Sequence, residues 1–253
     1  MEEVEYCDPF NGKKRDYFMK LEHTGRYVWA RDFITKNNIH SVADITCANG
    51  YGTKMLSAVC EHVDGYDVNS DYLKLAKKRN LNNADFITCD LNKDGITNKY
   101  DAIVSFETME HIDNTDNFVK TLSKAINNDG YLLLSVPNPK YELLDDNGNI
   151  LSPYHKHILS KQQVVDLFEK QGLALQQVLG QSLCNHIVSN LHELKHNESL
   201  KQNYNAKLLS KHNYSKEAII MNSYIYSYPD RINVDDSYSY IYVFKKSKRG
   251  KQK

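Results

Sequence analysis

Residues 42–52 read Val-Ala-Asp-Ile-Thr-Cys-Ala-Asn-Gly-Tyr-Gly, and residues 65–67 read Gly-Tyr-Asp. A short apolar run enters a glycine-containing loop, a helical segment follows, and a second apolar run ends on a carboxylate. Such a strand–loop–helix–strand unit presents backbone N–H groups to a nucleoside-containing ligand, and the acid can bind a ribose. The stretch therefore predicts a nucleoside cofactor before it indicates any chemistry.

The composition is that of an ordinary globular protein. Of the 253 residues 41% are hydrophobic, and 32 Lys plus Arg balance 32 Asp plus Glu. This length suits a single α/β domain over residues 1–253, and the balanced charge does not favour a nucleic-acid partner. The basic residues 245–253 leave nucleic acid as a less favoured alternative to a small-molecule partner.

Two observations bear on location. No apolar run is long enough to span a bilayer, and the acidic start Met1-Glu2-Glu3 differs from a secretion signal. The five cysteines form no C-x-x-C pair, which favours a reducing compartment and no zinc site. We therefore expect a cytoplasmic protein without membrane contact. The oligomeric state is not indicated.

Apolar runs alternate with helical patterns from residue 41 onward. Strands are predicted over residues 42–45, 63–66, 85–88, 102–106, 131–136, 173–179 and 238–244. Helices are predicted over residues 54–61, 71–81 (capped by Ser70) and 117–126, with another opened by the capping box Ser160–Gln163. This order predicts an α/β fold of three layers, Rossmann-like, with a seven-stranded, mainly parallel sheet.

The expected domain has four parts. Residues 1–40 form an N-terminal helical cover, 41–179 the nucleoside-binding core, 180–237 a cap insertion, and 238–253 the last strand and a basic tail. The cap is assigned because residues 180–237 break the alternation and are too long for an ordinary connection. Within it Tyr224, Tyr226 and Tyr228 alternate, which predicts one face of an extended segment.

The glycine pattern separates two classes of cofactor. A dinucleotide site requires the register G-x-G-x-x-G, which residues 46–52 do not supply. The pattern instead resembles D-x-G-x-G-x-G, the first motif of class I S-adenosylmethionine-dependent methyltransferases, with Asp44, Gly50 and Gly52 in place. Thr46 and Ala48 replace two glycines, and an alanine is tolerated there if its φ is negative.

Four later segments resemble the other motifs of that superfamily in order: residues 65–76, 88–90, 100–112 and 129–138. The chain is therefore identified as a member, nearest to members that modify sugars, glycans or small molecules. The resemblance implies S-adenosylmethionine as cofactor, with Asp67 on the ribose hydroxyls and Asp90 on the adenine amino group. It implies these cofactor-binding residues: Tyr27, Asp44, Cys47, Gly50, Gly52, Asp67, Val68, Asp90, Leu91, Phe106 and Glu107.

A sulfonium methyl is already activated, so the protein must mainly align an acceptor and remove its proton. Glu110 and His111 follow the fourth strand, at the sheet edge where open α/β folds place ligands. Residues 153–155, Pro-Tyr-His, resemble a segment of sugar-modifying members that faces the acceptor. We predict His111, His155 and Glu110 as catalytic residues. The alternatives are a loop-capping His111 and an exposed polar turn at 152–157.

No metal is expected as the first interpretation. Glu107, Glu110, His111 and His155 (or His157) could nevertheless form a site of two histidines and two carboxylates. This set of ligands is similar to the set found in metal-dependent methyltransferases that act on the 2′-hydroxyl of small RNAs.

The sequence thus favours an enzyme that methylates a hydroxyl or amine of a sugar, nucleotide-sugar or similar small molecule, by O- or N-methylation. One alternative is a metal-dependent RNA 2′-O-methyltransferase. A second is a non-catalytic partner subunit that binds S-adenosylmethionine, because Thr46 and Ala48 replace glycines. The identity of the acceptor is not predicted.

Overall fold

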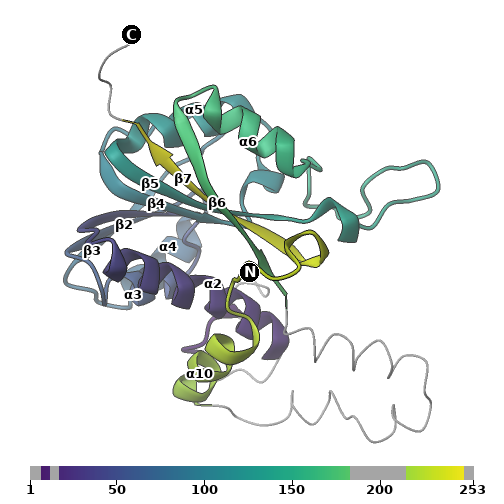
Figure 1. The fold of residues 1–253 in the computed structure, drawn as a ribbon. Helices are drawn as coiled ribbons and strands as arrows, with labels where there is room; N and C mark the ends of the chain where they lie inside the picture. Colours follow the sequence, from purple (N-terminus) through teal and green to yellow (C-terminus); the bar gives the residue numbers. More distant parts are fainter. Residues whose placement is uncertain (1–6, 12–16, 183–214, 248–253) are drawn as a thin grey trace, which may run out of the picture.

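The computed structural model of the protein describes residues 7–11, 17–182 and 215–247 (Figure 1). It confirms the predicted seven-stranded sheet, whose strand order is β3-β2-β1-β4-β5-β7-β6. The strands are β1 (Ser41–Ile45), β2 (His62–Asp67), β3 (Ala84–Thr88), β4 (Tyr100–Phe106), β5 (Ile126–Pro137), β6 (Leu173–Gln181) and β7 (Ser239–Lys246). The helices are α2 (Tyr17–Lys36), α3 (Tyr51–Leu56), α4 (Ser70–Lys77), α5 (Thr115–Ala125), α6 (Lys161–Glu169) and α10 (Lys216–Tyr226), and the 3-10 turns are η1 (Met109–His111), η2 (Pro139–Tyr141) and η3 (Val234–Asp236).

The sheet is mainly parallel, as predicted. Strands β1 to β5 pair in parallel, whereas β7 lies antiparallel between β5 and β6. The carboxyl ends of β1, β2 and β4 therefore meet at one edge of the sheet. In an open α/β sheet that edge is where ligands bind.

Helices cover both faces of the sheet, which gives three layers (Figure 1). Successive strand residues point to opposite faces, so Ile103 packs in one core and Val104 in the other. The first core includes Phe118 of α5 and Phe168 of α6, and the second includes Trp29 of α2. Burial on both faces explains why the central strands are almost continuously apolar. None of the described helices is both long and apolar enough to cross a membrane.

Two helix starts differ from the prediction. Helix α3 begins at Tyr51, directly after Gly50, whose φ of +75° turns the chain out of the loop. Helix α4 is capped by Asn69 rather than Ser70, because the Asn69 side chain accepts from the N–H groups of Asp71 and Tyr72. The capping box at the start of α6 is confirmed, with Ser160 and Gln163 bonded reciprocally.

The prediction of an extended tyrosine segment is wrong, because Tyr224 and Tyr226 lie in α10. The rings of Tyr224 and Tyr228 lie 4.8 Å apart, and the Tyr228 hydroxyl donates to Asp32 of α2 at 2.9 Å. Helix α10 lies against α2 (Figure 1), and a Cβ on Gly25 would lie 2.4 Å from Ser227 Oγ. The close approach of these segments therefore requires a glycine. Residues 183–214 of the predicted cap and 248–253 of the tail lie outside the described residues.

Candidate active site

A cavity of about 230 Å³ lies where β1, β2 and β4 end. It is lined by Cys7, His23, Tyr27, Thr46, Cys47, Ala48, Tyr51, Asp67, Tyr72, Phe106 and Glu107. The structure therefore brings together five of the predicted cofactor residues: Tyr27, Cys47, Asp67, Phe106 and Glu107. The Tyr27 ring meets those of Tyr51 and Phe106 edge-on, at 5.4 and 5.3 Å between centroids.

Asp67 is the last residue of β2 and one wall of this cavity. Its Oδ2 accepts the N–H of Ala48 and its Oδ1 accepts the N–H of Asn69, both at 2.8 Å. Burial raises the pKa of this carboxyl group above its usual value. A carboxylate oxygen has two lone pairs, so each oxygen keeps one for a ligand hydroxyl.

The loop between β1 and α3 holds two non-glycine residues in the left-handed region. Thr46 has φ +54° and Ala48 has φ +51°, so the negative φ that would make an alanine tolerable at position 48 is not found. The left-handed conformation costs roughly 1–2 kcal/mol for a residue with a Cβ. Thr46 recovers some of this cost, because its hydroxyl bonds Thr108 Oγ1 at 2.6 Å and donates to the Ile45 carbonyl at 2.7 Å.

Asp44, Gly50 and Gly52 lie behind the cavity rather than on its wall. The Asp44 carboxylate is fully buried and accepts the hydroxyls of Tyr27 at 3.0 Å and Thr53 at 2.7 Å. Burial raises the pKa of Asp44 to about 7. A Cβ on Gly52 would lie 2.0 Å from the Tyr27 ring. These residues therefore hold Tyr27 and the loop in place.

Three further predicted cofactor residues also do not line the cavity. Val68 is exposed, and Leu91 is buried in the apolar core. The Asp90 carboxylate accepts the N–H of Asn92 and pairs with Lys93 Nζ at 3.1 Å. Their contact with the cofactor stays a prediction.

The sequence interpretation missed four residues of the cavity wall: Cys7, His23, Tyr51 and Tyr72. His23 Nδ1 lies 3.3 Å from the Tyr51 hydroxyl, and burial, with the charge of Arg26, lowers the pKa of the His23 ring. The spacing of His23 and Tyr27, four residues apart on one helix, would have placed both on one face. This spacing of four residues within the helix Tyr17–Lys36 is the sequence signal that could have indicated His23.

Glu107 lies on the wall of the cofactor cavity and close enough to Glu110 for its charge to act on that residue. It lines the cavity, adopts φ +48°, and is the residue directly after β4. Its Oε1 accepts the hydroxyl of Ser135 at 2.6 Å and its Oε2 that of Ser239 at 3.3 Å. These bonds direct its carboxylate toward the ends of β5 and β7.

Glu110, His111 and His155 form a cluster in which one donor atom of each residue lies within 4.8 Å of the others. His111 Nε2 lies 3.8 Å from Glu110 Oε1, and the two imidazole rings are 5.1 Å apart. Glu110 is 5% exposed, and its Oε2 has no hydrogen-bond partner among the described residues. Burial and the nearby charge of Glu107 raise the pKa of Glu110 well above its usual value.

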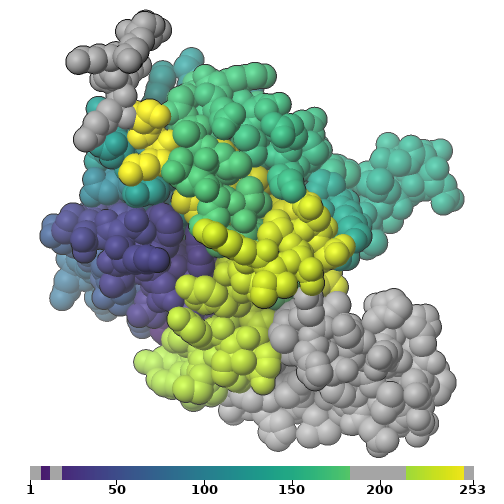
Figure 2. All heavy atoms as spheres, viewed as in Figure 1, coloured from purple at the N-terminus to yellow at the C-terminus, as the bar shows by residue number. Residues whose placement is uncertain are grey.

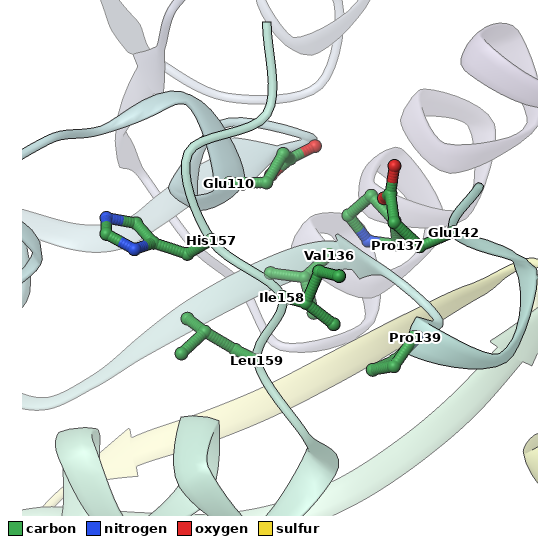
Figure 3. Close-up of a pocket in the computed structure, with 8 residues that line it drawn as sticks. All are labelled: Glu110, Val136, Pro137, Pro139, Glu142, His157, Ile158 and Leu159. Atoms are coloured by element: carbon green, nitrogen blue, oxygen red, sulfur yellow. The ribbon is translucent and has the colours of Figure 1, made fainter. Parts of the chain in front are cut away.

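His111 and His157 each form a hydrogen bond with a backbone carbonyl group. His111 Nδ1 lies 3.0 Å from the Tyr154 carbonyl, which can only accept, so Nδ1 carries the proton and Nε2 a lone pair. His157 Nε2 donates to the Ile112 carbonyl at 2.8 Å. In Figure 3 the His157 ring points away from the carboxyl groups of Glu110 and Glu142. His157 is therefore not a member of the cluster.

Comparison with known proteins assigns the family. Residues 14–178 match the family model Methyltransf_23, described as a methyltransferase domain. The chain belongs to this methyltransferase family. A protein of Mycolicibacterium smegmatis, described as an S-adenosylmethionine-dependent methyltransferase, is 22% identical over 143 residues, which cover 55% of this chain and 54% of that protein. Methyltransferase 235L of Invertebrate iridescent virus 6 is 30% identical over 134 residues, 48% of each chain. The chain thus spans about half the length of these curated relatives.

Solved structures confirm the Rossmann-like methyltransferase fold. An S-adenosylmethionine-dependent methyltransferase from Mesorhizobium loti is 14% identical, with 82% of this chain and 91% of that chain covered and a TM-score of 0.54. An O-methyltransferase of a Brevibacillus brevis polyketide synthase, in complex with S-adenosyl-L-homocysteine, is 17% identical, with 87% and 72% covered and a TM-score of 0.54. The [4+2]-cyclase SpnF is 12% identical, with 87% and 81% covered and a TM-score of 0.56. Because a cyclase shares this fold, the fold alone does not assign a reaction.

Family membership confirms S-adenosylmethionine as the expected cofactor, and the cavity residues fit it. Asp67 keeps lone pairs for two ribose hydroxyls, while Tyr72 and Phe106 offer flat apolar surface to a base. The side chains of Thr46 and Ala48 line the same cavity, where the superfamily motif has glycines.

Proposed function

We propose that this protein transfers a methyl group from S-adenosylmethionine to a hydroxyl or amine of a sugar, nucleotide-sugar or similar small molecule. One observation carries the proposal, namely that the cofactor cavity adjoins a cluster able to accept a proton. Glu107 lines the cavity, and its charge reaches Glu110, three residues further along the chain.

The cofactor supplies an activated methyl group, and the residues of this chain do the rest. Asp67 binds the ribose and so fixes where the methyl group is presented. His111 offers the lone pair of Nε2, and removing a proton from the acceptor with a positioned imidazole contributes typically about 10²–10⁴ in rate. A sugar fits because the cluster of Glu110, His111 and His155 offers several polar groups, and residues 153–155 resemble a segment of sugar-modifying members.

A metal-dependent RNA 2′-O-methyltransferase is the second candidate. The convergence of Glu110, His111 and His155, with a carboxylate oxygen that lacks a described partner, favours it. The predicted fourth ligand, Glu107, is bonded to Ser135 and Ser239 instead. Treatment with EDTA separates the candidates. Methylation of a sugar acceptor is expected to survive the chelator, whereas metal-dependent RNA methylation would stop and return on adding Mn²⁺.

Calorimetry with S-adenosylhomocysteine and transfer of a radiolabelled methyl group test the proposal. Asp67→Ala should abolish cofactor binding because the ribose loses its acceptor, while Asp71→Ala, which removes an exposed carboxylate of α4, should not. His111→Gln should keep cofactor binding and lose at least about tenfold in turnover.

Each outcome has a clear meaning. Failure of the wild type to bind S-adenosylhomocysteine would overturn both enzymatic candidates. Binding without transfer to any nucleotide-sugar, free sugar or RNA would support the partner-subunit alternative instead. Full activity of His111→Gln would remove this residue from the mechanism.

A further inference from the structure

We propose that Glu142 is a positioning residue for the acceptor-side cluster, and that its carboxylate fixes the ring orientation and tautomer of His155. The effect expected on turnover rests on the proposed methyl transfer. The effect expected on the His155 ring does not, because it concerns the protein without substrate.

The contact between the two side chains is short and sheltered. His155 Nδ1 lies 2.7 Å from Glu142 Oε2, and the side chains are 23% and 9% exposed. Glu142 follows η2 at the end of β5, and its N–H donates to the Pro139 carbonyl at 3.2 Å. In Figure 3 Glu142 and Glu110 line one small cavity. The backbone of Glu142 is therefore fixed by η2, and its side chain lies next to Glu110 of the cluster.

The chemistry of the pair selects one tautomer. An ionised carboxylate can only accept hydrogen bonds, so His155 Nδ1 carries the proton and Nε2 the lone pair. The Tyr154 carbonyl imposes the same tautomer on His111. The two rings, inclined at 66° to one another, thus have both Nδ1 atoms occupied by the chain. Each Nε2 is left for a ligand or a substrate proton.

Among the described residues, the His155 ring has a hydrogen bond with Glu142 and an edge-on contact with the His111 ring. Residues 142–155 form an arm that leaves the body and returns, with an antiparallel bridge between Leu144 and Ile150 (Figures 1 and 2). Glu142 and His155 stand at the two ends of this arm. The neighbours of the pair along the chain are exposed, with Leu143 at 70% and Tyr154 at 61%. The hydrogen bond to the carboxylate therefore sets the orientation of the ring and also closes the base of the arm.

Three variants test the proposal. Glu142→Gln keeps the size of the side chain but can present either an oxygen or an N–H to Nδ1. Glu142→Asp keeps the charge on a shorter side chain and should behave between Gln and wild type. Glu169→Gln, an exposed change of the same kind on α6, is the matched control.

The first measurement is the ¹⁵N NMR spectrum of the histidine rings of the full chain without substrate, with His155 assigned from a His155→Gln sample. The wild type should show one tautomer, protonated at Nδ1, and Glu142→Gln a mixture of both. Glu169→Gln should match the wild type. An unchanged His155 spectrum in Glu142→Gln would overturn the proposal, whether or not the protein transfers methyl groups.

The second measurement is turnover. Glu142→Gln should lower kcat about 10- to 100-fold, the loss that is typical when the hydrogen-bond partner orienting a metal-ligating histidine is changed. The affinity for S-adenosylhomocysteine should stay within about twofold of wild type, because Glu142 does not line the cofactor cavity. Loss of cofactor affinity in both Glu142→Gln and Glu142→Asp would indicate a general structural role and overturn the assignment. If the wild type transfers no methyl group to any acceptor, the proposed function fails and the NMR result alone decides on Glu142.

Discussion

Thr46 and Ala48 occupy the positions of the loop where the protein departs most from its superfamily. Both are left-handed, but only Thr46 has a side chain that bonds its surroundings. At Ala48 the main chain alone is used, through the N–H that Asp67 accepts. Thr46 and Ala48, which stand where the superfamily motif has glycines, therefore have different physical consequences. The sequence alone presents the two replacements as equivalent.

Replacing each residue with glycine should separate these consequences. Ala48→Gly relieves the left-handed strain and keeps the N–H, so stability should rise by up to about 1 kcal/mol after the backbone entropy of glycine is subtracted. Thr46→Gly loses its hydroxyl contacts, so we expect no gain or a loss of about 1 kcal/mol. Urea unfolding measures both. A larger gain for Thr46→Gly than for Ala48→Gly would contradict this account.

At the scale of elements, helix starts depend on which side chain reaches the free N–H groups. Asn69 and Ser70 are both residue types that cap helices, and the sequence favoured Ser70. The backbone of Asn69 is extended, with ψ 103°, and its side-chain oxygen accepts from the N–H groups of Asp71 and Tyr72. The backbone conformation of one residue, Asn69, thus decides which of the two side chains caps the helix.

Alanine substitutions test this assignment. Asn69→Ala should reduce the free energy of unfolding by about 1 kcal/mol, because two N–H groups of α4 lose their acceptor. Ser70→Ala should change it by less than about 0.5 kcal/mol. Thermal or urea unfolding at one pH gives both values. The reverse order would mean that Ser70 is the cap.

Over the whole molecule, burial of carboxyl groups at the ligand edge of the sheet links folding to pH. Burial raises the pKa values of Asp44, Asp67 and Glu110 above their ordinary values. A carboxyl group with a raised pKa binds its proton more tightly in the folded state. Its contribution is therefore fully favourable below the ordinary pKa and is lost as the pH rises through the folded value.

We expect the free energy of unfolding of the ligand-free protein to fall between about pH 4 and pH 7. For Asp44, a rise from 3.8 to about 7 corresponds to about 4 kcal/mol. Asp44→Asn should flatten this dependence, because the amide stays neutral and can still bond the hydroxyls of Tyr27 and Thr53. Asp71→Asn, at an exposed position, is the control. Urea unfolding across this range checks the result, and an equal slope in Asp44→Asn and wild type would contradict it.

The order of residues along the chain was sufficient to predict the fold and one wall of the cofactor cavity. The apolar periodicity is local, and parallel strands bring their carboxyl ends to one edge, so Asp67, Glu107 and the following Glu110–His111 could be placed together from the order of the strands. Motif order then identified the superfamily. These steps used local patterns and the general rule for parallel strands, and they required no particular side-chain contact.

Contacts between segments that lie apart in the chain could be identified only in the folded structure. Tyr27 meets Asp44 and His23 meets Tyr51 between different structural elements, and Glu142 meets His155 across the base of the arm formed by residues 142–155. The same is true of α10, whose tyrosines alternate in sequence but pack as a helix against α2. Side-chain orientation, tautomer and pKa depend on burial and on such partners. Those properties, which set the chemistry of the site, are fixed only when the folded chain brings the partners together.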